Sequence, residues 1–135
     1  MKRDNIDELI IKRLSVDSRT SFLSIAKELS ISEGTIRQRV AKLFKNGVIK
    51  KFTVELGTSA IAIVEIITSS SVPTQKISEK IKKLGVSKVY EVTGKFSIIA
   101  IINADDFNKL NSVLEEIRAI DGVIQTETFP VLKDY

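Results

Sequence analysis

The sequence predicts an α+β protein in which an N-terminal winged helix-turn-helix precedes a ferredoxin-like βαββαβ domain. Three observations predict this fold. Residues 1–54 contain three short amphipathic helix patterns with very short breaks between them. Residues 60–135 instead alternate strand and helix patterns in the order βαββαβ. The charge also divides the chain, because residues 1–54 carry 12 Lys/Arg and 6 Asp/Glu, whereas residues 55–135 carry 9 and 11.

The first two helices follow from apolar residues that recur every three or four positions. The first begins after Asp4, whose carboxylate can cap free N–H groups at a helix start, and its apolar stripe ends at Leu14. The second ends its stripe at Leu29, and either Thr20 or Ser21 can cap it. Each helix therefore has one face to bury against a neighbour.

A third helix begins after Ser32 and ends at Asn46-Gly47, where glycine can adopt a left-handed C-cap conformation. Its buried stripe is expected to be Ile36, Val40 and Leu43. Residues 48–54 combine β-favouring side chains with two lysines, which predicts a short wing strand. Residues 55–59 are predicted to form a polar and flexible linker between the two domains.

The elements of the second domain are predicted from alternating periods. Each helix is followed by a Gly-Val pair, Gly85-Val86 or Gly122-Val123, in which glycine can end the helix before a strand starts. The expected elements are strands at 60–67, 86–92, 96–102 and 123–128 and helices at 73–84 and 105–120. In such a domain both helices cover one face of a four-stranded antiparallel sheet.

The uncovered face of this sheet is predicted to be apolar. Isoleucine or another apolar residue occupies nearly every position of the strand at 60–67, and residues 98–102 are apolar throughout. Several isoleucines left in water would exceed the apolar patch that soluble monomers usually expose. We therefore expect a homodimer formed through the sheet faces. A helix of the N-terminal domain that folds back over this face is the alternative.

Cysteine and histidine are absent, which excludes disulfides, thiolate nucleophiles, zinc-finger sites and imidazole acid–base chemistry. An oxygen-only metal site or a carboxylate mechanism stays open, but we expect no catalytic residue, no metal and no cofactor. No apolar run approaches the roughly 20 residues of a membrane-spanning helix. The N-terminus lacks the apolar stretch of a secretory signal, so a cytoplasmic protein without a membrane partner is expected.

The third helix is predicted to lie in the major groove of double-stranded DNA, because six basic residues and one acidic residue occur between Ser32 and Lys51. Arg37 and Gln38 can each form paired hydrogen bonds with a base edge, whereas the lysines, Lys45 included, are expected to neutralise phosphates. The predicted DNA-binding residues are Thr20, Ser21, Ser32, Glu33, Thr35, Arg37, Gln38, Arg39, Lys42, Lys50 and Lys51. A merely solvated helix face is the alternative interpretation.

A set of short runs carries a family resemblance. The runs are 17–21, 25–32, 39–43 and 46–49, together with Val92-Thr93-Gly94-Lys95-Phe96 in the second domain. Over nearly its whole length the chain resembles the Lrp/AsnC family of feast/famine transcription regulators, and most closely its short archaeal members. The resemblance implies dimers, often assembled into tetramers or octamers, that bind pseudo-palindromic operators and respond to an amino acid held between dimers.

Two positions depart from the family pattern. Ser30 stands where the turn between the second and third helices often has glycine. Ser97 replaces the aspartate that usually ends the Thr-Gly-x-Tyr/Phe-Asp turn. Without a carboxylate to pair with an effector's ammonium group, a neutral or acidic amino acid, or no effector, is expected. The expected pocket residues are Gly94, Lys95, Phe96, Ser97, Thr126 and Thr128, and a plain tight turn is the alternative.

Together these features predict a sequence-specific transcription regulator whose assembly or DNA affinity is modulated by a small amino acid. An architectural protein that coats DNA with little sequence preference is the alternative within DNA binding. The siroheme decarboxylases resemble the same two-domain arrangement, but they rely on histidine, which this chain lacks. An enzyme is therefore not expected.

Overall fold

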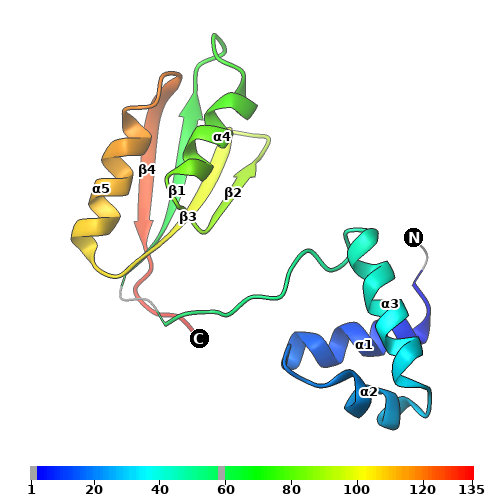
Figure 1. The fold of residues 1–135 in the computed structure, drawn as a ribbon. Coiled ribbons are helices and arrows are strands. Elements are labelled where there is room, and N and C mark those ends of the chain that lie inside the picture. Colours follow the sequence, from blue (N-terminus) through cyan, green and yellow to red (C-terminus); the bar gives the residue numbers. More distant parts are fainter. Residues whose placement is uncertain (1–2, 58–59) are drawn as a thin grey trace. The chain divides into compact units, whose positions relative to one another are not determined.

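The computed structural model describes residues 3–57 and 60–135, which belong to two compact units (Figure 1). The first unit extends to Glu55 and the second begins at Leu56. Thr58 and Ser59 of the predicted linker lie outside the described residues. Within the described ranges, no helix is both long enough and apolar enough to cross a membrane.

The N-terminal unit consists of the three predicted helices, α1 (Asn5–Val16), α2 (Phe22–Leu29) and α3 (Glu33–Lys45). Each begins at a side-chain cap that accepts a hydrogen bond from the backbone N–H three residues further on. The caps are Asp4, Ser21 and Ser32. Because a cap satisfies an N–H group that the helix itself cannot, these short helices start at defined residues.

A tight left-handed turn joins α2 to α3. Ser30 has φ 54° and ψ 41°, and it is the one residue other than glycine with positive φ among those described. The backbone N–H of Ile31 then donates to the carbonyl of Ala26 over 3.0 Å, which closes the end of α2. The small Ala26 and the neighbouring Ile25 are buried against α3. The turn thus forms without glycine, at the cost that a left-handed conformation imposes on any residue with a Cβ.

The predicted wing strand is wrong. Residues 50–57 have no regular secondary structure, and no strand is present among residues 3–57. The N–H groups of Val48 and Ile49 both donate to the carbonyl of Leu43, so these residues wrap around the end of α3. A strand needs a hydrogen-bonded partner strand, and β-favouring side chains alone do not supply one.

The C-terminal unit is the predicted βαββαβ domain, with both helices on one face of the sheet (Figure 1). Its elements are β1 (Ala60–Thr68), α4 (Thr74–Lys83), β2 (Lys88–Glu91), β3 (Ile98–Ala104), α5 (Phe107–Arg118) and β4 (Val123–Pro130). The strand order is β2-β3-β1-β4, and each neighbouring pair is antiparallel. β2 is shorter than the predicted strand at 86–92, whereas β4 extends two residues beyond its predicted end.

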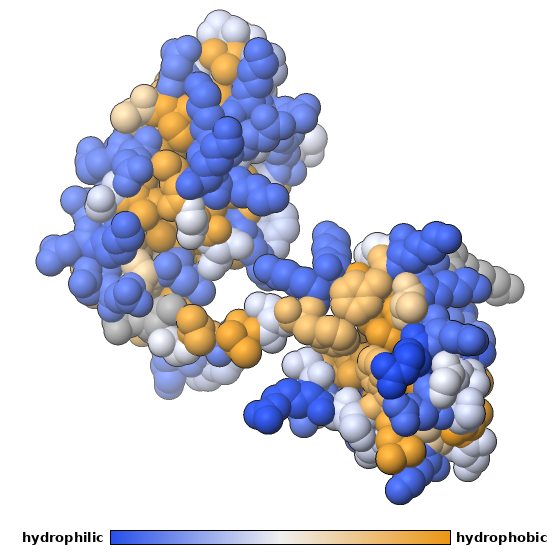
Figure 2. Space-filling model, in the orientation of Figure 1, coloured by the Kyte–Doolittle hydropathy of each residue, from blue (hydrophilic) through white to orange (hydrophobic). Residues whose placement is uncertain are grey.

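The face of the sheet that carries the helices is the core of this unit. Val64, Ile66 and Ile98 point from the strands toward α4 and α5 and are fully buried. Gly122 has φ +94°, and a Cβ there would lie 2.8 Å from Ile77 Cδ1 and 2.9 Å from Val72 Cβ. On this side hydrophilic side chains cover the helices, and apolar surface is visible between them (Figure 2).

The opposite face of the sheet has no helix of its own unit over it. The register places Ile63 beside Ile101 on one side and beside Phe129 on the other, so their side chains form one apolar row. Ile63 remains 39% exposed and Phe129 remains 43% exposed. The expectation of an apolar uncovered face is therefore confirmed for this row, whereas the next row of the same face pairs Glu65 with Glu127.

Candidate functional site

The exposed side of α3 is polar and basic. Successive helix residues turn by about 100° around the axis. The side opposite the buried Ile36, Val40 and Leu43 therefore carries a set of exposed residues. They are Gly34, Gln38, Ala41, Lys42 and Lys45. Gly34 and Ala41 are not among the predicted DNA contacts, although the same helical periodicity places them there. Their small size lets a large ligand come close to the helix backbone.

Arg37 and Glu33 form an ion pair along the edge of this face. Arg37 Nη2 lies 2.6 Å from Glu33 Oε1, one helical turn away, and the guanidinium lies 5.5 Å from the centre of the Phe22 ring. Both side chains stay exposed, with 66% of Arg37 accessible. An exposed pair of this kind contributes little to stability, so Arg37 can leave Glu33 for a stronger partner.

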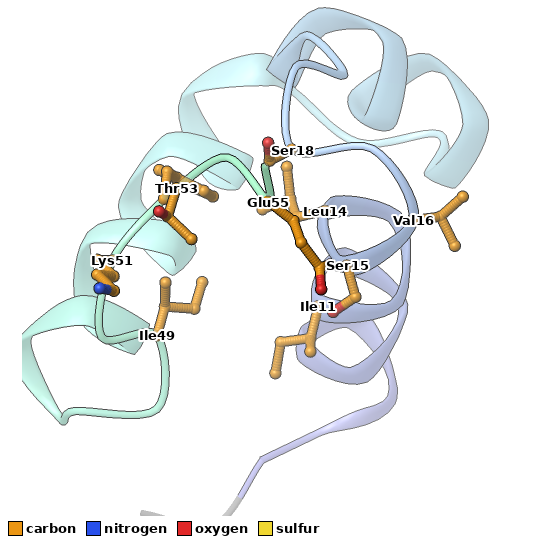
Figure 3. A pocket seen from close by; sticks show the side chains of 10 residues that line it. Ile11, Leu14, Ser15, Val16, Ser18, Ile49, Lys51, Thr53 and Glu55 are labelled. Carbon is orange, nitrogen blue, oxygen red and sulfur yellow. The ribbon is translucent and has the colours of Figure 1, made fainter. Parts of the chain in front are cut away.

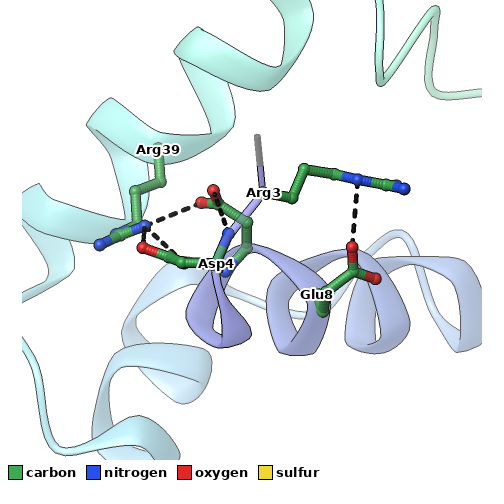
Figure 4. Close-up of polar contacts among 5 residues, drawn as sticks. Arg3, Asp4, Glu8 and Arg39 are labelled. Carbon is green, nitrogen blue, oxygen red and sulfur yellow. Dashed lines mark hydrogen bonds and ion pairs between the residues drawn. The ribbon is translucent and has the colours of Figure 1, made fainter. Parts of the chain in front are cut away.

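Arg39 is directed to the start of α1 rather than outward (Figure 4). Its Nη1 lies 2.8 Å from Asp4 Oδ2 and 2.9 Å from Asp7 Oδ1. The pKa of Asp4 is lowered, first by the hydrogen bond from the backbone N–H of Asp7 and then by the hydrogen bond from Arg39. Arg39, predicted to contact DNA, thus holds α3 against α1, and the residues that sequence reasoning missed are the two carboxylates.

The predicted serine and threonine contacts serve first as helix caps. Ser32 Oγ accepts from the N–H of Thr35 over 3.1 Å and lies 2.8 Å from Thr35 Oγ1. Ser21 Oγ accepts from the N–H of Ser24, and Thr20 is half-buried in the turn before it. The helix starts that they cap still present backbone N–H groups and partial positive charge, which suit a phosphate.

Residues 50–55 run beside the end of α1 and enclose an open cavity of about 410 Å³ (Figure 3). Lys51, Thr53 and Glu55 line it from the extended segment. Nearby, the Phe52 ring meets that of Phe44 edge to face at 5.3 Å between centres, and apolar surface shows beside the carboxyl end of α3 (Figure 2). Lys50 and Lys51 are both exposed, as phosphate contacts require.

The C-terminal unit holds a second cavity, of about 270 Å³, on the uncovered face of the sheet. It is lined by Lys95 and Phe96 of the β2–β3 turn, two of the predicted effector residues. The other lining residues are Glu65, Ile67, Gln125 and Glu127. Gly94 gives the turn its shape with φ +129°, and the backbone of Ser97 bonds to Ile66 and Val92.

The structure does not bring Thr126 and Thr128 to this cavity. Thr126 pairs with Ile66 and Thr128 with Val64, so both threonines lie on the helix-covered face. Thr126 Oγ1 accepts from Arg118 Nε of α5 over 3.1 Å. Strand alternation instead turns Gln125 and Glu127 toward the cavity. The sequence alone shows the alternation but not which set faces the turn.

Neither unit offers a preformed metal centre in the part of the chain that is described, because no three acidic side chains are placed to share an ion.

Two family models match the chain, one for each unit. Residues 4–43 match the AsnC-type helix-turn-helix domain. Residues 59–135, more than half of the chain, match the Lrp/AsnC ligand binding domain.

Among curated proteins, the HTH-type transcriptional regulator LysM of Sulfurisphaera tokodaii is 49% identical over 45 residues, which are 33% of this chain and 32% of that protein. The matches to the curated relatives thus span about a third of their length. E. coli AsnC has a solved structure that is 28% identical, with a TM-score of 0.82 over 99% of this chain and 95% of that one. A feast or famine regulatory protein from M. tuberculosis, solved with L-methionine, shares the fold at 22% identity, with a TM-score of 0.86 over 98% and 93%.

Proposed function

Because the chain belongs to the Lrp/AsnC family, we propose that it is a sequence-specific DNA-binding transcription regulator that responds to a small amino acid. The observation that carries the proposal is the exposed side of α3. Lys42 and Lys45 form no ion pair within the described residues. Gln38 lies between them and the helix start. These side chains remain available to a polyanion.

In the proposed complex, the exposed side of α3 enters the major groove. Gln38 can donate to and accept from the edge of adenine, whereas the lysines can neutralise phosphates without reading sequence. Arg37 can exchange its weak pair with Glu33 for guanine. The capped starts of α2 and α3 would hold phosphates on either side. Arg39 supports this contact indirectly, since it fixes α3 to Asp4 and Asp7.

A second copy of the chain is proposed to cover the apolar face of the sheet. Ile63, Ile101 and Phe129 form a row that stays partly exposed in the single unit. Burial of such a row releases apolar surface from water, which favours association. A dimer would present two copies of α3, and their spacing would select two half-sites about one turn of DNA apart.

The amino acid is proposed to bind in the cavity beside Lys95 and Phe96. The Lys95 ammonium can pair with a carboxylate, which every amino acid carries. The M. tuberculosis structure with L-methionine supports an amino acid as a ligand for this fold.

Selection of bound fragments from a random DNA pool, with and without a mixture of amino acids, tests the proposal. We expect one pseudo-palindromic sequence to be enriched and its enrichment to change when amino acids are present. The same selection with Gln38→Ala tests the base contact, because this variant should lose the sequence preference at one base position of each half-site. Equal recovery of all sequences at fixed salt would instead indicate an architectural DNA-binding protein.

A further inference from the structure

Two glutamates oppose each other on the uncovered face of the sheet. The register of β1 and β4 pairs Glu65 directly with Glu127. Directly opposed side chains have Cβ atoms about 5 Å apart, and like charges at such positions destabilise an antiparallel pair. Neither carboxylate forms an ion pair within residues 3–57 and 60–135. A positive charge between them would remove the repulsion.

Both glutamates line the cavity of about 270 Å³, and so does Lys95. Lys95 forms no ion pair with either glutamate. Lys95 Nζ lies 5.5 Å from the centre of the Phe96 ring, so it is held over the aromatic face of its neighbour. Ile67 and Gln125 complete the lining. The cavity therefore offers two carboxylates on the strands, one ammonium group on the turn and an aromatic ring beside it.

We infer that this cavity selects an amino acid with a positively charged side chain. One ammonium or guanidinium group of the ligand lies between Glu65 and Glu127, and its α-carboxylate pairs with Lys95. The inference rests on the proposed function, which places an amino acid here. Two carboxylates and one ammonium leave the lining with one negative charge in excess. A basic amino acid neutralises it, a neutral one leaves it, and an acidic one adds to it.

This assignment reverses the expectation of a neutral or acidic effector, which rested on Ser97 and its neighbour Lys95. The missing aspartate is compensated from the strands. Glu65 and Glu127 lie 32 and 30 residues away from Ser97 along the chain, and only the strand register brings them to the turn. The apolar row with Ile63 and Phe129 is the next one along the same face.

Isothermal titration of the full chain with L-lysine, L-norleucine and L-glutamate tests the inference. Norleucine has the same backbone groups and the same four-carbon chain as lysine but lacks the terminal ammonium group. We expect lysine to bind more tightly than norleucine by about tenfold or more, and glutamate to bind most weakly.

Three variants locate the effect. Glu127→Gln should bring the lysine-to-norleucine ratio close to one, whereas Glu79→Gln on exposed α4 removes the same charge elsewhere and should leave the ratio unchanged. Lys95→Met should weaken both amino acids but not cadaverine, which has no carboxylate. Equal or tighter binding of norleucine, or a lysine preference that survives in Glu127→Gln, would overturn the inference while the amino-acid effector stands. No binding by any amino acid would instead refute the effector part of the proposed function, which DNA selection measures separately.

Discussion

The N-terminal unit joins its helices by ion pairs as well as by an apolar core, whereas the C-terminal unit exposes apolar side chains on one face of its sheet. The N-terminal unit has seven buried apolar residues in its core, and the C-terminal unit has fourteen, as far as the chain is described. The N-terminal unit also has ion pairs between its helices, such as those of Arg39 with Asp4 and Asp7. The C-terminal unit has apolar side chains that stay partly exposed on the uncovered face of its sheet. Among the charged residues of α3, Arg39 is therefore engaged within the unit rather than free for DNA.

The largest effect that separates the units should come from Ile36→Ala. Ile36 is fully buried between the helices, and removal of its side chain should lower the free energy of unfolding of the N-terminal unit by about 2–5 kcal/mol. Urea denaturation followed by circular dichroism, together with DNA binding, measures the loss. The matched Ile117→Ala in α5 should destabilise the other unit and leave DNA binding in place below its transition. If both variants shift one common transition, the units do not unfold separately.

Ile101→Lys tests the surplus apolar face. Two copies of the substitution would meet in a dimer that is symmetric across the sheets, and a buried, unpaired lysine is costly. We expect monomers in sedimentation velocity, which corresponds to a dimer weakened by roughly 100-fold or more, about 3 kcal/mol. Ser112→Lys adds the same charge on the exposed side of α5 and should leave the dimer intact. Dimers of Ile101→Lys would mean that the copies associate elsewhere.

Gln38 and Lys42 lie on the same side of α3 but are expected to contribute differently to DNA binding. Gln38→Ala should weaken binding to the selected operator by about 1–3 kcal/mol more than binding to random DNA, because a base contact carries specificity. Lys42→Ala should weaken binding to both and flatten the salt dependence, because it removes a phosphate contact. Competition titrations at several salt concentrations measure both quantities. Equal losses for Gln38→Ala on the two DNAs would place Gln38 on the backbone.

Sequence reasoning predicted the elements well because their signals are local. Helix caps such as Ser21 and Ser32, and glycines such as Gly85 and Gly122 before the strands, act within a few residues. The wing failed because its β-favouring residues lack a partner strand, which no local pattern reveals.

The candidate site was predicted less completely, because its geometry depends on distant residues. Arg39 pairs with carboxylates 35 and 32 positions away. Lys95 and Phe96 lie in the predicted turn, but Glu65 and Glu127 reach them only through the strand register. A helical wheel of α3, in contrast, could have identified Gly34 and Ala41.

The ion pairs in the N-terminal unit predict a dependence on pH. The pKa of Asp4 is lowered in the folded protein, so its charged form is favoured by folding. The resulting stabilisation is complete above the pKa of the unfolded chain, near pH 4, and it is lost as pH falls through the lower folded value. The melting temperature of the wild type should therefore exceed that of Asp4→Asn at pH 7 and approach it as the pH falls below the lowered pKa of Asp4. A constant difference across this range would show that the charge is not responsible.

The smallest change in the free energy of unfolding should come from a substitution in the turn between α2 and α3. Its sign should be opposite to that of a glycine substitution in the C-terminal unit. Ser30 is left-handed at φ 54°, a conformation that costs a residue with a Cβ about 1–2 kcal/mol and costs glycine nothing. Glycine also makes the unfolded chain more flexible, and the larger loss of conformational entropy on folding offsets about 0.5–1 kcal/mol of this gain. Ser30→Gly should therefore raise the free energy of unfolding by roughly 0.5–1 kcal/mol, measured by urea denaturation. Gly122→Ala should do the reverse, because its Cβ would press on Val72 and Ile77. A loss of stability in Ser30→Gly would mean that the serine side chain supports the turn, so that its hydroxyl rather than backbone freedom lets this helix-turn-helix close.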